Sequence, residues 1–177
     1  FRGISEFRAG QLGLKLLMRF GNPADWPSLL ERDAPDTIGR ALTWADRVPI
    51  HQPIFAWVHL FEPHSPYDLH PDATGEIPPY LDHRPILADE PGHVYTEAEI
   101  SALRQQYAAE VAYVDAQIGE FLDGLRARGR LQNALVLVVA DHGESLGEPG
   151  VMFNHHGLHD EVLRVPLPLW ASNPQEW

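Results

Sequence analysis

The stretch ALVLVVADHGE, residues 134–144, decides the fold, because an apolar run ends there in acidic and imidazole side chains. Residues 134–140 have the length and composition of a strand that is buried on both faces. Asp141 and His142 follow at the carboxyl end of this strand, which is where ligands bind in parallel α/β sheets. The stretch therefore predicts a site at one edge of a sheet.

A second apolar run lies upstream, in residues 54–61 (IFAWVHLF), and it also predicts a strand covered on both faces. Residues 62–92 follow it as a long loop rich in Pro, His, Asp and Gly, a type of loop that is often functional. His64 lies at the start of this loop. Both histidine-bearing loops therefore follow strands, and we expect them on the same side of one sheet.

Helices are predicted between these strands. Residues 96–128 begin with the capping box formed by Thr96 and Glu99, continue with apolar residues at steps of three and four, and end before Gly129. Residues 33–48 form a shorter amphipathic helix, and residues 165–170 form a last, edge-type strand interrupted by prolines. Alternating strands and helices favour an α/β class with a mostly parallel central sheet.

Composition limits the function classes. The 177 residues suffice for one domain, and 44% of them are hydrophobic, enough for a packed core. The formal net charge of -12 argues against nucleic-acid binding and against attraction to anionic lipid. The sequence has no cysteine, no G-x-S-x-G elbow and no glycine-rich phosphate loop, so no activated nucleophile is recognisable in it. No apolar run is long enough for a membrane span.

The residues alone leave the role of each candidate open. Asp141 and His142 are either ligands of one cation or caps of the following loop. His155 and His156 are metal ligands, anion contacts, proton donors or solvated polar residues. His64 is either held at the site by its flanking prolines or part of a polar turn. The nearby acids, Glu144 and Glu148, could support the site or act as general bases, but such residues are more often solvated, and we expect that here.

Four ordered motifs resemble the sulfatase family of the alkaline phosphatase superfamily, in its bacterial DHGESLG form. They are FAWVHLFEPHSPY (55–67), YAAEVAYVDAQIGEFLDGLRARG (107–129), ALVLVVADHGESLG (134–147) and HHGLHDEVLRVPL (155–167). The resemblance implies a large α/β/α sandwich with a central sheet. It also implies a metal-dependent hydrolase of sulfate esters, whose relatives act on phosphate or phosphonate esters.

The resemblance implies a role for each candidate. Asp141 and His142 match the positions that bind the catalytic divalent cation, usually calcium, with manganese, zinc and magnesium as alternatives. His64 matches the histidine that contacts the ester group or the leaving oxygen. His155, or His156 after a shift of one residue, stands where many members of the family have a lysine that contacts the transferred group.

Two family features have no counterpart in the sequence: the aspartate pair of the first strand and the C/S-x-P-S/A-R motif of the nucleophile. We therefore expect residues 1–177 to form one partial catalytic domain, incomplete on the N-terminal side of its sheet and inactive by itself. The alternatives are a phosphate or phosphonate ester hydrolase, a phosphoryl transferase, and a non-catalytic remnant or interaction fragment. The expected partner is a small-molecule ester, and no nucleic acid is expected. The oligomeric state is left open, and the resemblance suggests a periplasmic, secreted or membrane-anchored parent protein.

Overall fold

The computed structural model describes residues 32–65, 67, 94–148, 153, 155 and 157–173. The chain divides into two compact units, Phe1–Asp33 and Ala34–Trp177. The elements and the candidate site described below all lie in the second unit. The predictions for His156 and for most of the loop at 62–92 fall outside the described residues.

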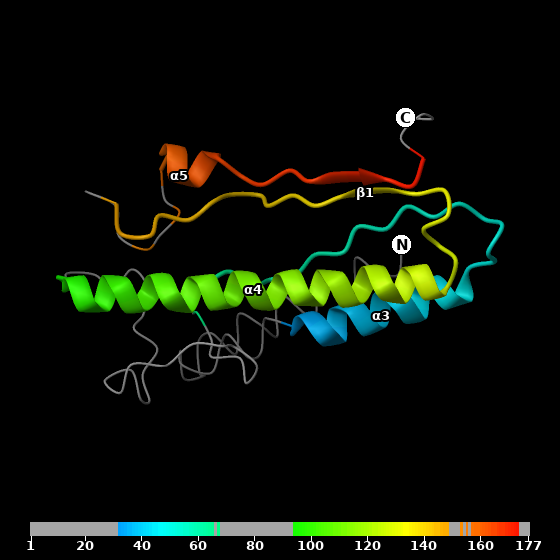
Figure 1. The fold of residues 1–177 in the computed structure, drawn as a ribbon, viewed down its shortest axis with the longest axis horizontal. Helices are drawn as coiled ribbons and strands as arrows, with labels where there is room; N and C mark the ends of the chain where they lie inside the picture. Colours follow the sequence, from blue (N-terminus) through cyan, green and yellow to red (C-terminus); the bar gives the residue numbers. More distant parts are fainter. Residues whose placement is uncertain are drawn as a thin grey trace, which may run out of the picture. The chain divides into compact units, whose positions relative to one another are not determined.

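The longest element is helix α4, Glu97–Ala127 (Figure 1). Its capping box is formed as predicted: the Thr96 backbone N–H donates to Glu99 Oε2 at 2.7 Å, and the Glu99 N–H donates to Thr96 Oγ1 at 3.3 Å. At the other end Gly129 adopts a φ of 70°, and its N–H donates to the Arg126 carbonyl at 2.9 Å. The sequence signals at the two ends therefore place this helix to within one residue.

Helix α3, Ala34–Arg47, packs along the C-terminal half of α4 (Figure 1). The close approach depends on Gly124, because a Cβ there would lie 2.7 Å from Leu42 Cδ1. Arg130 fixes the end of α3, since its guanidinium donates to the carbonyl oxygens of Ala45 at 2.9 Å and Pro49 at 3.2 Å. The prediction of a helix over residues 33–48 is confirmed.

The two strands form a short antiparallel ribbon, β1 (Leu135–Leu137) with β2 (Leu169–Ala171), in which Val136 faces Trp170. The prediction for residues 134–140 is wrong in two respects. The strand is shorter than expected, and Leu137 is 54% exposed, so neither the length nor the burial is as predicted. The only strand pair among the described residues is antiparallel, and it therefore does not display the parallel arrangement expected of the central sheet.

Residues 54–61 form no strand with the described residues, contrary to the prediction. Phe55 and Trp57 are 85% and 74% exposed, so one face of this segment is not covered by the described residues. The alternate residues Ile54, Val58 and Leu60 are only partly buried, so the other face is not fully covered either. Its apolar composition is that of a central strand, whose stability depends on neighbours on both edges. With no strand partner among the described residues, the segment does not display the ladder that its composition predicts.

The apolar core lies at the N-terminal half of α4 and holds the two loops of the candidate site. Its buried members are Tyr67 from the first loop, Ile100 and Leu103 from α4, and Phe153 from the second loop. Gly147 makes the turn between DHGE and Phe153 with a φ of 89°, a conformation that suits glycine. One small core therefore positions both loops relative to α4.

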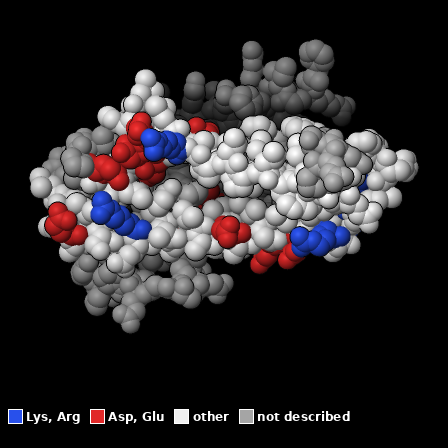
Figure 2. Space-filling model, turned by 45° about the horizontal axis from the view of Figure 1, so that its top comes forward, with Lys and Arg blue, Asp and Glu red and all other residues white. Residues whose placement is uncertain are grey.

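None of the helices in the described part of the chain is long and apolar enough to cross a membrane. The face drawn in Figure 2 shows Lys and Arg side chains in small separate groups, mostly beside acidic ones. The face that the figure shows therefore has no extended basic surface, which agrees with the net charge of -12.

Candidate active site

The DHG triplet, residues 141–143, follows strand β1 and packs against the short helix α5, Asp160–Leu163. The Gly143 N–H donates to the Val162 carbonyl at 2.7 Å. A Cβ at Gly143 would overlap the carbonyl oxygen of Glu161, so a residue without a side chain is required for this close approach. The glycine of the motif thus fixes the turn from which His142 projects.

Backbone oxygens hold two histidines in one defined orientation. His64 Nδ1 lies 2.6 Å from the Ser65 carbonyl oxygen, and His142 Nδ1 lies 2.8 Å from the Gly143 carbonyl oxygen. A carbonyl oxygen can only accept, so each Nδ1 carries the proton and donates it. In both rings Nε2 is then the nitrogen that can bind a cation, accept a proton or, when protonated, donate one.

His155 completes a cluster of three imidazoles. One ring nitrogen from each of His64, His142 and His155 lies within 4.8 Å of the others. The rings of His142 and His155 stack with their centroids 4.3 Å apart, and the centroid of His64 lies 5.1 Å from that of His155. The three residues come from the two loops that the sequence predicted to lie on the same side of the sheet.

Asp141 lies at the margin of this cluster. Its Oδ1 accepts from the His142 backbone N–H at 3.0 Å and lies 3.8 Å from His142 Nε2. This separation is shorter than the sum of two metal–ligand bonds of about 2.0–2.5 Å each, so one cation can contact both atoms. Because the carboxylate is 82% exposed, the cation would be open to further ligands.

Glu144 is the residue that the sequence interpretation missed. Its side chain is only 5% exposed, and its Oε1 lies 3.7 Å from His155 Nδ1, so the expectation that it is solvated is wrong. Glu148 is also engaged, since it accepts from Ser145 Oγ at 2.9 Å and from the Leu146 N–H at 2.6 Å. The only sequence signal for Glu144 was its position directly after the DHG triplet.

Two tyrosines near Glu144 have raised pKa values. Burial, and then the negative charge of Glu144, raise the pKa of Tyr67 above its usual range. The same two causes, in the same order, raise the pKa of Tyr107 on α4. Burial would raise the pKa of Glu148 too, but its hydrogen bonds with Ser145 and Leu146 lower it below the usual value. Glu144 is therefore a buried acid that lies near two phenols with raised pKa values.

The family model for the sulfatases matches residues 16–176. The chain belongs to the sulfatase family. An alkaline phosphatase-like α/β fold follows from this membership, and members of the family are metal-dependent hydrolases of sulfate esters. The resemblance inferred from the four motifs is thereby confirmed.

Three relatives illustrate the match. A sulfatase of Formosa agariphila is 29% identical over 93% of this chain, and a choline-sulfatase of Rhizobium meliloti is 30% identical over 62% of it. An arylsulfatase K of Bos taurus is 37% identical over 46% of it. The matches cover 36%, 25% and 15% of the lengths of these relatives, so this sulfatase-family chain spans about a third or less of each.

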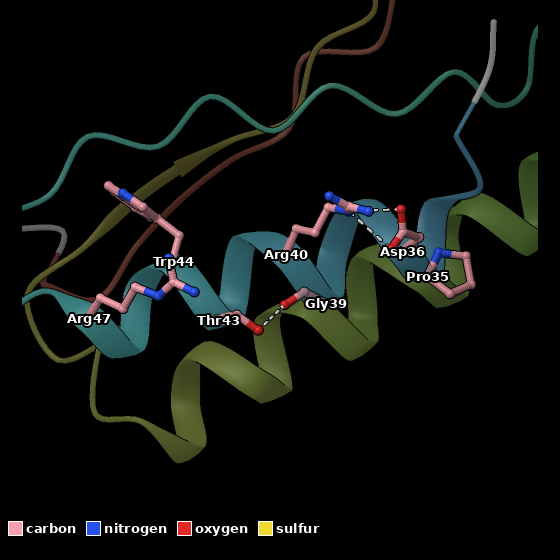
Figure 3. Close-up of a pocket in the computed structure, with 7 residues that line it drawn as sticks. All are labelled: Pro35, Asp36, Gly39, Arg40, Thr43, Trp44 and Arg47. Carbon is pink, nitrogen blue, oxygen red and sulfur yellow. Dashed lines mark hydrogen bonds and ion pairs between the residues drawn. The ribbon is translucent and has the colours of Figure 1, made fainter. Parts of the chain in front are cut away.

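A hollow on the exposed side of α3 is separate from the residues predicted for the sulfatase site (Figure 3). Its lining comes from this one helix: Pro35, Asp36, Gly39, Arg40, Thr43, Trp44 and Arg47. Arg40 and Asp36 pair with each other at 2.9 Å one helical turn apart, as Figure 3 shows. Surface pairs of this kind are explained by the helix itself and indicate no chemistry.

Proposed function

We propose that the protein containing this chain hydrolyses small-molecule sulfate esters with a divalent cation, and that His64, Asp141, His142 and His155 lie at the reacting group. The observation that carries the proposal is the cluster of three imidazoles beside Asp141, formed in a chain of the sulfatase family. The names of the relatives, a choline-sulfatase and an arylsulfatase among them, support the substrate class.

Asp141 and His142 are the residues proposed to hold the cation. The carboxylate oxygen and the imidazole nitrogen, 3.8 Å apart, form a donor set that fits a divalent ion. The bound cation would supply positive charge against the oxygens of the sulfate group. Calcium is proposed first on family grounds, although the imidazole ligand also suits manganese or zinc, and magnesium is the further alternative.

His64 and His155 are proposed to contact the ester. The Nδ1–H of His64 is held by the Ser65 carbonyl, so its Nε2, when protonated, can donate a proton to the departing alcohol oxygen. His155, whose side chain is 29% exposed, is proposed to contact the transferred group at the position where many members have lysine. His156 lies outside the described residues and stays the alternative for that contact.

The domain as a whole is proposed to be an α/β/α sandwich with a mostly parallel central sheet, of which residues 1–177 form a part. We propose that the nucleophile and further cation ligands come from residues beyond this chain. Two observations support this: the matches cover 36%, 25% and 15% of the lengths of the three relatives, and residues 54–61 lack strand neighbours among the described residues. The chain alone should then show little or no turnover.

A phosphate or phosphonate ester is the second candidate substrate. The observation that favours it is His155, because an imidazole replaces the lysine ammonium and can also act as a metal ligand, as in phosphatase-like relatives. A non-catalytic remnant is the third reading, and the absence of hydrolysis with every ester would support it.

The test compares the two leaving-group-matched esters 4-nitrophenyl sulfate and 4-nitrophenyl phosphate, using the full-length protein with and without a chelator. We expect chelator-sensitive hydrolysis with a larger kcat/KM for the sulfate. A larger kcat/KM for the phosphate would transfer the assignment to phosphoryl chemistry. Equal rates with and without the chelator would contradict the role of a cation.

A further inference from the structure

A buried carboxylate lies directly behind the histidine cluster. Glu144 is 5% exposed at its side chain, and Oε1 is 3.7 Å from Nδ1 of His155. Burial of a carboxylate is costly unless polar groups compensate for the lost water. An acid in this position is therefore placed there at an energetic cost, and His155 is an ionisable group directly beside it.

The three imidazoles have related surroundings. Nδ1 donates to a backbone carbonyl in two of them, Ser65 for His64 and Gly143 for His142, whereas Nδ1 of His155 lies 3.7 Å from Glu144 Oε1, beyond hydrogen-bond distance. Nε2, on the opposite side of each ring, is then the nitrogen that suits the common centre. A carboxylate or carbonyl behind an imidazole is the arrangement that fixes which nitrogen carries the proton and how the ring is turned.

We propose that Glu144 is a positioning residue for His155: its carboxylate holds the His155 proton on Nδ1 and turns Nε2 toward His64 and His142. This inference rests on the proposed function insofar as it assigns the three histidines to one site. It adds a residue that acts through His155 and itself touches no substrate. His64 and His142 do not need such a residue, because backbone carbonyls perform the same task for them.

Glu148 provides the matched control. It belongs to the same loop, but its carboxylate accepts from Ser145 Oγ and from the Leu146 N–H, so it holds the loop backbone rather than a histidine. Glu144→Gln and Glu148→Gln each replace a carboxyl group by an amide, with almost no change in side-chain volume. A general effect of replacing an acid in this loop would show in both variants, whereas a positioning effect would show in the first alone.

The experiment is ¹⁵N NMR of the imidazole rings in the full-length protein at a pH where the histidines are neutral, with His155→Ala to assign the signals. In the wild type we expect His155 to carry its proton on Nδ1. In Glu144→Gln we expect at least half of the His155 population to move to the Nε2–H form, while His64, His142 and the Glu148→Gln variant stay unchanged.

Three results would overturn the proposal: a wild-type His155 protonated on Nε2, an unchanged tautomer in Glu144→Gln, or an equal response in Glu148→Gln. The first of these needs neither glutamate variant, so it decides the matter even where Glu144→Gln or Glu148→Gln does not fold. The readout needs no substrate. A protein without sulfatase activity but with the expected tautomer shift would refute the proposed function and leave the role of Glu144 standing.

Discussion

The imidazole rings of His142 and His155 stack, with centroids 4.3 Å apart and planes inclined by 25°. The two residues belong to different segments, one following β1 and the other preceding α5. Their contact therefore depends on whatever holds these segments together. Two features hold these segments together: the core around Leu103 and Phe153, and the packing of Gly143 against α5.

The first prediction concerns this core. Leu103→Ala should lower the free energy of unfolding by about 2–5 kcal/mol, because Leu103 is 0% exposed and its truncation leaves a cavity. Leu163→Ala on α5 is the control, with an expected loss of well under 1 kcal/mol, since that side chain is 57% exposed. Urea unfolding of both variants measures the difference, and similar losses would refute the placement of the core.

The glycine of the DHG triplet gives the second prediction. Gly143→Ala should destabilise the chain by about 1–3 kcal/mol, because the new methyl group would overlap the Glu161 carbonyl. Gly119→Ala, within α4, should stabilise it by about 0.5–1 kcal/mol, since nothing lies within 4 Å of the added atom and alanine favours the helix. Opposite shifts in Tm are expected. Shifts of the same sign would contradict the close packing at Gly143.

The third prediction concerns alkaline pH. The folded pKa of Tyr67 is raised by burial and by Glu144, whereas the unfolded phenol ionises near pH ~10. Above that pH the unfolded chain releases this proton while the folded chain keeps it. The free energy of unfolding should therefore be unaffected by this group below pH ~10 and should fall as the pH rises above it.

Tyr67→Phe should make that decrease shallower, without abolishing it, because the pKa of Tyr107 is raised as well. Urea unfolding between pH ~8 and pH ~11 measures the slope for both proteins. Identical slopes would mean that the phenol of Tyr67 is not shielded in the folded chain.

Helices were predictable from sequence because their signals are local. The capping box of Thr96 and Glu99 and the terminal Gly129 are features of neighbouring residues, and both form as predicted. Capping interactions between neighbouring residues are sufficient to determine where this helix begins and ends.

Strands were predicted less well because they need partners. Residues 54–61 have the composition of a central strand, yet they pair with nothing among the described residues, and β1 is shorter than its apolar run. The burial of Glu144 was missed for a related reason. Whether an acid after the DHG triplet meets solvent or His155 is decided by how distant segments pack, and spacing along the chain does not encode it.

The convergence of His64, His142 and His155 was predictable in part. Each loop follows a predicted strand, so both loops were expected at one edge of the sheet. The structure brings the three rings together. The roles of these residues, and the cation assigned to Asp141 and His142, stay predictions.

The central claim is that Asp141 binds the cation of a sulfatase site while His64 acts on the ester. The most direct test measures bound divalent metal and 4-nitrophenyl sulfate hydrolysis together in the full-length protein, for the wild type, Asp141→Asn and His64→Ala. The account predicts that Asp141→Asn loses both the metal and at least about 100-fold in kcat, whereas His64→Ala keeps the metal and loses a comparable factor in kcat. Wild-type metal content and turnover in Asp141→Asn would contradict it.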